Sequence, residues 1–404
     1  MSKLSPETIE FINKHRKDDV RQLALQSKKD GKVDINEAVT QIAGWQIAEK
    51  KIPSWSKIDS IIYPKHLSME QCSSEITARF KASLVKGETF ADLTSGFGVD
   101  CSFIASGFKH AHYVERQEEL CDIARHNFKI LGLNHIEVHN TDGIEFLKNM
   151  EPVDCIYLDP ARRNSNGVKT VAITDCEPDV SSMEELLVEK GSTVMIKLSP
   201  MLDLHSAMKT LKHINSIYII SVNNECKELV IILSKHSFSD EKAVDNLKIS
   251  CEQLVNNSEI QHLEFTYEEE KSAEINYSDN IGEYLYEPGA AILKAGAFKI
   301  LAKKFCVNKL HQNSQLYTSD ELIDFPGRRF KVIEVSTFAK KNLKAFLKDL
   351  EKANLTIRNF PSTVDDLRKK LKLKEGGDVY IFATTLANGD KVLIKCQSLK
   401  SFVS

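Results

Sequence analysis

The sequence predicts an α/β protein built on a Rossmann-like, doubly wound sheet of seven strands, with a helical N-terminal domain and C-terminal α+β domains. From residue 88 onward, short apolar runs alternate with amphipathic segments, the pattern of parallel strands joined by helices. Only residues 223–227 separate the last two runs, too few for a parallel crossover. The seventh strand is therefore expected to run antiparallel in a hairpin.

Four domains are expected along the 404 residues. Residues 1–85 show helical periodicity, broken by prolines, and end in a predicted helix over 69–85. The domain 86–236 holds the seven predicted strands, at 89–93, 112–115, 136–139, 155–158, 193–198, 216–222 and 228–234. Residues 237–326 suggest a small α+β insert. Residues 327–404 predict a strand at 330–335, a helix at 340–353, a second helix at 363–371 and a hairpin over 379–396.

The charge of the chain is unevenly distributed. Residues 326–404 hold 17 lysines and arginines against 8 acidic residues, an excess of +9, while the remainder carries −12. Such segregation indicates either a surface that meets a polyanion or a solvated basic face.

Several classes of protein are not favoured by the composition. No apolar run approaches the roughly 18 residues of a membrane helix, and residues 1–17 lack the apolar core of a signal peptide. We therefore expect a cytoplasmic protein without membrane contact. The nine cysteines are scattered without a C-x-x-C pair, so we predict reduced thiols and no metal site.

A glycine-rich turn, Asp92 to Gly98, follows the first predicted strand. Gly96 and Gly98 allow the backbone to bend and to approach a ligand closely, and Thr94 lies in the same turn. The acidic Asp92 would repel a pyrophosphate but attract an ammonium group. These residues therefore indicate S-adenosylmethionine rather than a dinucleotide.

Further cofactor contacts are predicted at neighbouring strand ends. Glu115 ends the second strand, where a carboxylate can accept hydrogen bonds from ribose hydroxyls. Asp142 follows the third strand and is equally explained as an acceptor for the adenine amine or as a helix N-cap. Ser73 and Thr77, in the helix before the first strand, are predicted to cover the methionine moiety, although capping explains part of that polar cluster.

The predicted chemical site follows the fourth strand, at Asp159-Pro160-Ala161-Arg162-Arg163. Asp159 and nearby carbonyls can accept hydrogen bonds from a substrate amine and turn its lone pair toward a methyl donor. We predict catalytic roles for Asp159, Pro160 and Arg162, and a substrate contact for Arg163. Methylation at a pyrimidine C5 atom would need a cysteine nucleophile. Cys155 and Cys176 are the candidates, and that chemistry ranks second.

Residues 88–235 resemble class I S-adenosylmethionine-dependent methyltransferases, through the turn Asp92 to Gly98 and the step Asp159-Pro160. The stretch Asp159 to Arg162 is similar to the D-P-P-Y signature of amino-directed nucleic-acid methyltransferases. Arg162 stands where those enzymes carry a base-stacking aromatic. Either its guanidinium plane stacks instead, or the target differs.

Residues 328–404 resemble the THUMP-like domain attached to such methyltransferases in a family of bacterial proteins, as does the stretch from Tyr63 to Ala78. The resemblance of the C-terminal domain rests on the segments Asn359-Phe360-Pro361, Leu367-Arg368-Lys369-Lys370 and Gly376-Gly377-Asp378-Val379-Tyr380.

The resemblance implies a substrate class, because THUMP domains accompany enzymes that modify transfer RNA. It implies methylation of a base, preferably at an exocyclic amine, in tRNA or rRNA. Arg368, Lys369 and Lys370 are then predicted to hold the RNA. The alternatives are a protein or small-molecule methyltransferase, and an RNA-binding protein with a vestigial cofactor site. Intact Asp92, Glu115 and Asp159 argue against the last.

Overall fold

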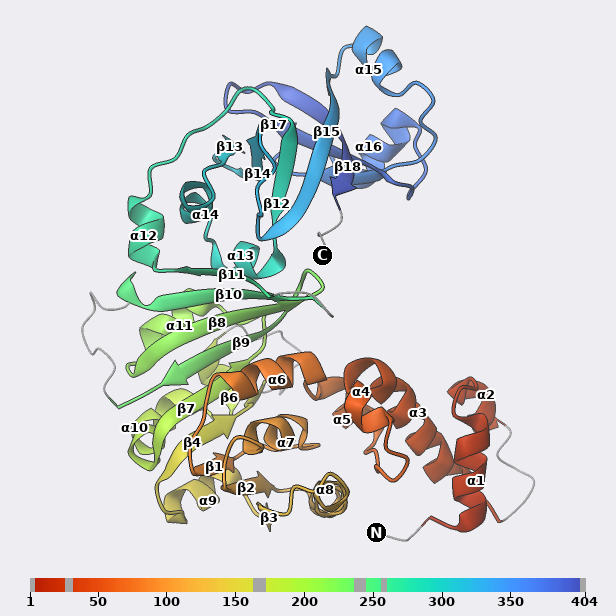
Figure 1. The fold of residues 1–404 in the computed structure, drawn as a ribbon, viewed down its shortest axis with the longest axis vertical. Coiled ribbons are helices and arrows are strands. Elements are labelled where there is room, and N and C mark those ends of the chain that lie inside the picture. Colours follow the sequence, from red (N-terminus) through yellow and green to blue (C-terminus); the bar gives the residue numbers. More distant parts are fainter. Residues whose placement is uncertain (1–3, 26–31, 163–171, 236–244, 256–259, 400–404) are drawn as a thin grey trace. The chain divides into compact units, whose positions relative to one another are not determined.

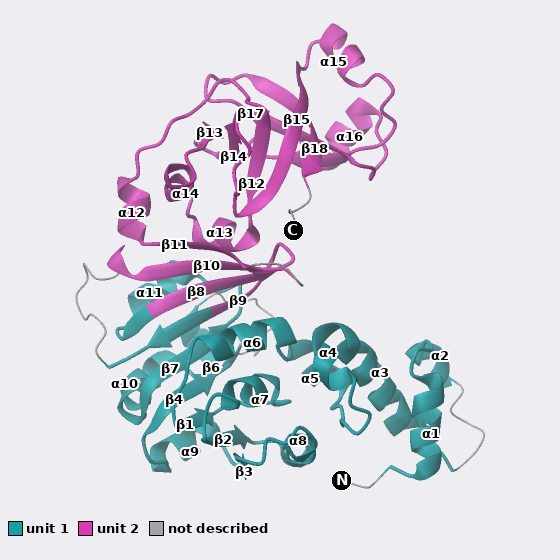
Figure 2. Cartoon of the chain, in the orientation of Figure 1, with its two compact units in different colours: residues 1–215, 230–239 teal, residues 216–229, 240–404 magenta. Residues whose placement is uncertain are grey.

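The computed structural model describes residues 4–25, 32–162, 172–235, 245–255 and 260–399 (Figure 1). The chain divides into two compact units (Figure 2). The first comprises Met1–Asn215 and Val230–Ser239, and the second comprises Ser216–Leu229 and Asp240–Ser404. None of the helices in the described ranges is both long enough and apolar enough to cross a membrane.

The first unit begins with six helices. They are α1 (Pro6–His15), α2 (Val20–Leu25), α3 (Ile35–Lys51), α4 (Pro53–Ser56), α5 (His66–Gln71) and α6 (Glu75–Ser83). The single helix predicted for 69–85 is wrong, because Ser74 adopts an extended conformation and its hydroxyl accepts a hydrogen bond from the Thr77 N–H. That N-cap starts a new helix after a break at 72–74.

A sheet of nine strands follows, in the order β11-β10-β8-β9-β7-β4-β1-β2-β3. All seven predicted strands are present. They are β1 (Thr89–Asp92), β2 (His110–Glu115), β3 (Ile136–Asn140), β4 (Val153–Leu158), β7 (Gly191–Leu198), β8 (Ile214–Val222) and β9 (Glu225–Leu233). The pairs β1–β2, β2–β3, β1–β4 and β4–β7 are parallel. This part of the sheet confirms the predicted Rossmann-like methyltransferase arrangement.

Helices lie on both faces of the parallel strands, namely α7 (Val99–Ala105), α8 (Glu118–Ile130), α9 (Gly143–Asn149), α10 (Val180–Lys190) and α11 (Leu204–Thr210). Consecutive side chains of a strand point to opposite faces. On β2, Tyr113 contacts Phe128 of α8, while its neighbour His112 contacts Phe146 of α9. The sheet is therefore covered by α8 on one face and by α9 on the other.

The hairpin between β8 and β9 has a tighter turn than predicted. Only Asn223 and Asn224 separate the strands, and both are left-handed, with φ of 49° and 64°. Two such residues form the type I′ turn that joins antiparallel neighbours, which makes β9 antiparallel to β8. Two further strands, β10 (Lys248–Leu254) and β11 (Gln261–Phe265), extend the sheet beyond the predicted seven.

The second unit contains a seven-stranded sheet in the order β13-β14-β12-β15-β18-β17-β16. Its strands are β12 (Tyr284–Pro288), β13 (Asn308–His311), β14 (Ser314–Ser319), β15 (Gly327–Thr337), β16 (Asn354–Ile357), β17 (Val379–Thr385) and β18 (Lys391–Leu399). Its helices are α12 (Tyr267–Ser272), α13 (Ala290–Ala295), α14 (Lys299–Lys304), α15 (Lys340–Phe346) and α16 (Val364–Leu371). The helix predicted for 340–353 is too long, since the chain leaves it after Phe346 and turns at Asp349, whose φ is 60°. Residues 237–326 supply strands to both sheets.

Candidate cofactor and active site

The turn after β1 is fixed between the two neighbouring strands. The Leu93 N–H donates to the carbonyl of Tyr157 on β4 at 3.0 Å, and the Ser95 N–H donates to the carbonyl of Val114 on β2 at 3.1 Å. These bonds continue the sheet pairing past the end of β1. The turn therefore lies at the carboxyl edge of the parallel strands, where ligands bind in open α/β folds.

The two glycines of the turn are left-handed and have different surroundings. Gly96 has a φ of 54°, and a Cβ atom built on it would meet nothing within 4 Å. Gly98 has a φ of 85°, and its Cβ would lie 3.1 Å from the ring of Phe128. Between them, Phe97 is buried against Trp55 of α4, with ring centroids 5.2 Å apart. The turn is thus anchored by the N-terminal helices through Phe97 and leaves open space beside Gly96.

Asp92 is completely buried and only partly hydrogen-bonded. Its Oδ1 accepts from the Thr94 N–H at 3.1 Å, whereas its Oδ2 has no hydrogen-bond partner among the residues that the structure describes. Burial raises the pKa of Asp92 well above its ordinary value, against the lowering effect of the Thr94 N–H. A buried carboxylate oxygen without a donor fits a cationic group of a ligand.

Glu115, at the end of β2, holds the glycine turn directly. Its Oε2 accepts from the Gly96 N–H at 3.0 Å, and its Oε1 accepts from the Gln117 N–H at 2.8 Å. Each carboxylate oxygen can accept a second hydrogen bond, so the side chain can still bind ribose hydroxyls.

Asp142 is an N-cap, as one of its two predicted roles requires. Its carboxylate accepts from the Ile144 N–H at 2.9 Å and from the Glu145 N–H at 3.3 Å. The next residue, Gly143, lies so close to the glycine turn that a Cβ atom would come within 2.2 Å of the Leu93 carbonyl oxygen. The end of β3 therefore lies beside the turn that follows β1.

These residues fit S-adenosylmethionine in three respects: a buried carboxylate for an ammonium, open space beside a left-handed glycine, and a carboxylate at the end of β2. The structure brings together all the cofactor residues predicted at strand ends, which are Asp92, Thr94, Gly96, Gly98, Glu115 and Asp142. Their contacts with a cofactor stay a prediction.

Asp159 directly follows β4 and is tied to the glycine turn, because its N–H donates to the Thr94 Oγ1 at 2.6 Å. Its Oδ2 lies 2.6 Å from the Nζ of Lys197 on β7. The side chain of Asp159 is 38% exposed, whereas that of Lys197 is 11% exposed. Asp159 is therefore the accessible end of an ion pair that reaches into the protein.

Behind this pair lies a buried ionic network centred on Asp100 of α7. Its carboxylate is 3.6 Å from Lys197 and 2.9 Å from Lys81 of α6. Tyr157 and Ser73 donate hydroxyl hydrogen bonds to it at 2.6 and 2.7 Å. Burial alone would raise the pKa of Asp100, but the two lysines and the hydroxyl donors hold it below its ordinary value. The network therefore keeps a negative charge buried beside the site.

The two residues predicted to cover the cofactor have structural partners. Ser73 is buried in the network, where Lys81 also donates to its hydroxyl at 2.8 Å. Thr77 is buried and donates to the Ser74 carbonyl at 3.1 Å. A cofactor contact for either residue stays a prediction.

The segment after Asp159 is only partly described. Pro160 is buried, and β5 (Ala161–Arg162) pairs with β6 (Cys176–Glu177) in an antiparallel bridge. Arg163 lies outside the described residues. The two candidate nucleophiles, Cys155 and Cys176, are both buried, and burial raises the pKa of the Cys155 thiol. Because a nucleophilic cysteine needs an accessible thiolate, this arrangement does not favour C5 chemistry.

The three basic residues predicted to hold RNA lie on α16 of the second unit and differ in their contacts. Arg368 donates to the Ala353 carbonyl at 3.2 Å, which gives it a structural role. Lys370 is exposed and lies over the ring of Phe338 at 5.1 Å. Lys369 is exposed.

Lys81, Asp100 and Lys197 were not predicted as site residues. The sequence does contain a signal for Lys197. This charged residue interrupts the apolar run 194–198 near a strand end, as Asp92 does in its own strand. No comparable signal marks Lys81.

Family models match three parts of the chain. Residues 327–398 match a THUMP-like domain, and residues 284–326 match a ferredoxin-like domain. Residues 21–165 match the model of protein-L-isoaspartate(D-aspartate) O-methyltransferase. No curated protein sequence matches the chain.

Solved structures give a match over the whole chain. The crystal structure of a "putative methyltransferase" from Porphyromonas gingivalis W83 is 33% identical in sequence, covers 98% of each chain and has a TM-score of 0.86. TrmK of M. capricolum in complex with S-adenosylhomocysteine is 16% identical, covers 41% of this chain and 70% of its own, and has a TM-score of 0.32, too low for any conclusion. This chain is similar to the P. gingivalis protein in both sequence and fold over nearly its whole length. It therefore belongs to the same family of class I methyltransferases with a C-terminal THUMP-like domain.

Proposed function

We propose that the protein transfers a methyl group from S-adenosylmethionine to an exocyclic amine of a base in tRNA or rRNA. One observation carries the proposal. The Asp159 N–H donates to the Thr94 Oγ1 at 2.6 Å, so a partly exposed carboxylate is held against the turn that fits the cofactor. In this proposal the substrate amine approaches that carboxylate, which accepts a hydrogen bond from it.

The cofactor would be held by three groups of this chain. Asp92 Oδ2, which is buried and has no hydrogen-bond partner within the described part of the chain, would accept from the ammonium. Glu115 would accept hydrogen bonds from the ribose hydroxyls. The open space beside Gly96 would hold the part of the cofactor that lies between its ammonium group and its ribose. When bound, the cofactor supplies an electrophilic methyl group, so positioning and charge complementarity can provide most of the catalysis.

Asp159 would orient the amine. By accepting a hydrogen bond from the amino group, it keeps the nitrogen lone pair turned toward the methyl donor. The same carboxylate is an acceptor for the proton that the amine loses after methylation. Desolvation raises the pKa of Asp159, whereas Lys197, 2.6 Å away, favours the ionised carboxylate and would hold it in one orientation.

An RNA substrate is supported by the second unit. Residues 327–398 match a THUMP-like domain, and THUMP domains accompany RNA-modifying enzymes. Residues 326–404 carry +9 in a chain whose remainder carries −12. A basic surface attracts a polyanion that an acidic catalytic body would repel.

A carboxyl-directed protein methyltransferase is the second candidate, because residues 21–165 match a model of that activity. The site favours the amine. Asp159 can accept a hydrogen bond from a neutral amino group, whereas an ionised substrate carboxylate has no hydrogen to donate to it.

Labelled methyl transfer separates the two candidates. The full chain and its Asp159→Ala variant are incubated with labelled cofactor and either total RNA from a deletion strain or protein from the same strain, and labelled nucleosides are identified by mass spectrometry. We expect a base methylated at its amino group with the wild type and none with the variant, which should still bind the cofactor. Label in protein but not in RNA would favour the second candidate, and an active Asp159→Ala variant would place the chemistry elsewhere.

A further inference from the structure

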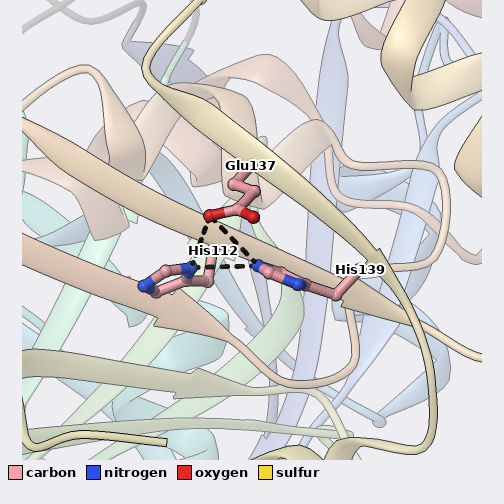
Figure 3. Close-up of side chains that lie close together, drawn as sticks. All are labelled: His112, Glu137 and His139. Atoms are coloured by element: carbon pink, nitrogen blue, oxygen red, sulfur yellow. Dashed lines mark hydrogen bonds and ion pairs between the residues drawn. The ribbon is translucent and has the colours of Figure 1, made fainter.

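Three side chains with metal-binding atoms lie close together (Figure 3), on the face of the parallel sheet that α9 covers. His112 lies on β2, and Glu137 and His139 lie on β3. The parallel register places His112 opposite Glu137. Since His139 is two residues beyond Glu137, all three side chains leave the sheet on the same side.

We propose that His112, Glu137 and His139 bind a divalent transition-metal ion, Zn²⁺ in the first instance, which cross-links β2 and β3. The Nδ1 of His112 lies 3.0 Å from the Nε2 of His139. The Oε2 of Glu137 lies 3.9 Å from the first of these nitrogens and 3.8 Å from the second. Figure 3 shows the three groups turned toward one another.

The spacing is that of a zinc site. Tetrahedral zinc holds imidazole nitrogens and carboxylate oxygens at about 2.0–2.2 Å, so its ligand atoms lie roughly 3.4 Å from one another. The three distances here, 3.0, 3.8 and 3.9 Å, bracket that value. Small rotations of the side chains would therefore complete three corners of a tetrahedron. The side chain of Glu137 is 69% exposed, so water can reach the fourth corner.

The two imidazoles are held in place from one side. The ring of Phe146 lies 5.6 Å from that of His112 and 4.7 Å from that of His139. This packing restricts both rings, which lowers the entropic cost of binding an ion. Two imidazoles and one carboxylate also form a donor set that suits zinc and not Mg²⁺, which prefers oxygen ligands.

A bound ion would stabilise the strands that carry predicted cofactor contacts. Glu115 lies three residues beyond His112 on β2, and Asp142 lies three residues beyond His139. Metal binding at this cluster does not depend on methyl transfer and can be tested separately from it. Its competitor is an N–H···N hydrogen bond between the two imidazoles, which 3.0 Å also permits without any metal.

Calorimetric titration tests the site. The full chain, stripped of metal with a chelator and carrying Cys306→Ser to remove its exposed thiol, is titrated with Zn²⁺ and separately with Mg²⁺. We expect one Zn²⁺ per chain, no Mg²⁺ binding, and a rise in Tm with Zn²⁺. His112→Ala and His139→Ala should each weaken Zn²⁺ binding at least about tenfold, since even loss of outer-shell partners costs this much. His66→Ala is the control, because His66 also lies near a glutamate, Glu70, at 3.7 Å but outside the cluster.

A further variant guards against misfolding. Glu137→Gln removes an exposed charge without disturbing the core and should also weaken Zn²⁺ binding, while its metal-free Tm should equal that of the parent. Absence of Zn²⁺ binding to the parent chain would overturn the proposal. So would equal affinity in the parent and in both the His139→Ala and Glu137→Gln variants, which would leave the imidazole pair as an ordinary hydrogen bond.

Discussion

Asp92 combines a cost in stability with a predicted role in binding. Its carboxyl is completely buried, and its Oδ2 accepts no hydrogen bond from any described residue. Keeping such a group is unfavourable for the free protein unless a ligand supplies the missing donor. Sites that are strained in this way commonly trade stability for function.

The Asp92→Asn variant should therefore be more stable without cofactor and should bind the cofactor less tightly. The pKa of Asp92 is raised from its ordinary value of 3.8, so the wild type loses stability as the pH rises above that value. The stability advantage of the variant should be present at pH 7.5 and shrink toward pH 4, as thermal unfolding across this range can show. By calorimetry, cofactor binding should weaken by about 1.5–3 kcal/mol. Unchanged cofactor affinity would refute the assignment of Asp92.

Lys197 and Lys81 allow the role of the ion pair to be separated from that of the buried network. Both lysines contact Asp100, and Lys197 also forms an ion pair with Asp159. We expect Lys197→Met to lower kcat by about 10²-fold through misplacement of Asp159, with cofactor affinity little changed. Lys81→Met should cost similar stability, because each variant breaks a buried pair, yet should keep most of the activity. If both variants kept the kcat of the wild type, the network would act only on stability.

The turn between β3 and α9 is packed against the glycine turn by a close backbone approach. In a Gly143→Ala variant the new methyl would lie 2.2 Å from the Leu93 carbonyl oxygen, so the turn must move. We expect a loss of about 1–3 kcal/mol in the free energy of unfolding together with weaker cofactor binding. Gly107→Ala is a matched control, since its Cβ would lie 3.6 Å from its nearest neighbour, an ordinary contact. Identical behaviour of the two variants would mean that the turn tolerates displacement.

The strands of the first sheet could be predicted because their signal is local. Each buried strand is a short apolar run, and helical segments separate most of them. The break between α5 and α6 was missed because Cys72 ends one helix and Ser74 caps the next inside a segment whose composition suits one continuous helix. The strands β10 and β11 were not predicted as part of this sheet, since pairing between distant segments leaves no local pattern.

In the candidate site, too, residues with a local sequence signal could be predicted, and contacts between distant segments could not. Asp92, Glu115 and Asp159 could be predicted because each stands at the end of a recognisable strand. The partnership of Lys81 with Asp100 depends on how α6 packs against α7, and sequence spacing does not encode it. The histidine cluster is similar. His112 and His139 are 27 residues apart, and only the register of β2 with β3 brings them together. This explains why spacing alone predicted no metal site.

The two units carry different parts of the proposed function. All the predicted cofactor residues lie in the first unit. The THUMP-like region and the basic excess lie in the second, where α16 carries Arg368, Lys369 and Lys370 in its last turn. Cofactor binding and RNA binding should therefore respond to separate sets of substitutions.

We expect the basic surface near α16 to bind RNA. Arg368 is unsuited to a test of phosphate contacts, because it bonds to the Ala353 carbonyl. Lys369, Lys370 and Lys374 are exposed, so replacing all three with glutamine should remove charge and leave the fold intact. Each phosphate contact to a single strand contributes about 0.7 to the slope of log affinity against log salt. The triple variant should therefore bind RNA less tightly at low salt and show a slope smaller by about 2.

The control removes the same charge elsewhere. Lys14, Lys17 and Lys50 are exposed lysines of the N-terminal region, and their replacement with glutamine should leave the salt slope as it is in the wild type. Fluorescence anisotropy with a labelled RNA at several salt concentrations gives the slopes, and calorimetry with the cofactor should give the same affinity for all three proteins. If the α16 variant and the control bind RNA with the same slope, the charge near α16 is a solvated face. The protein-directed activity would then become the better account of the site.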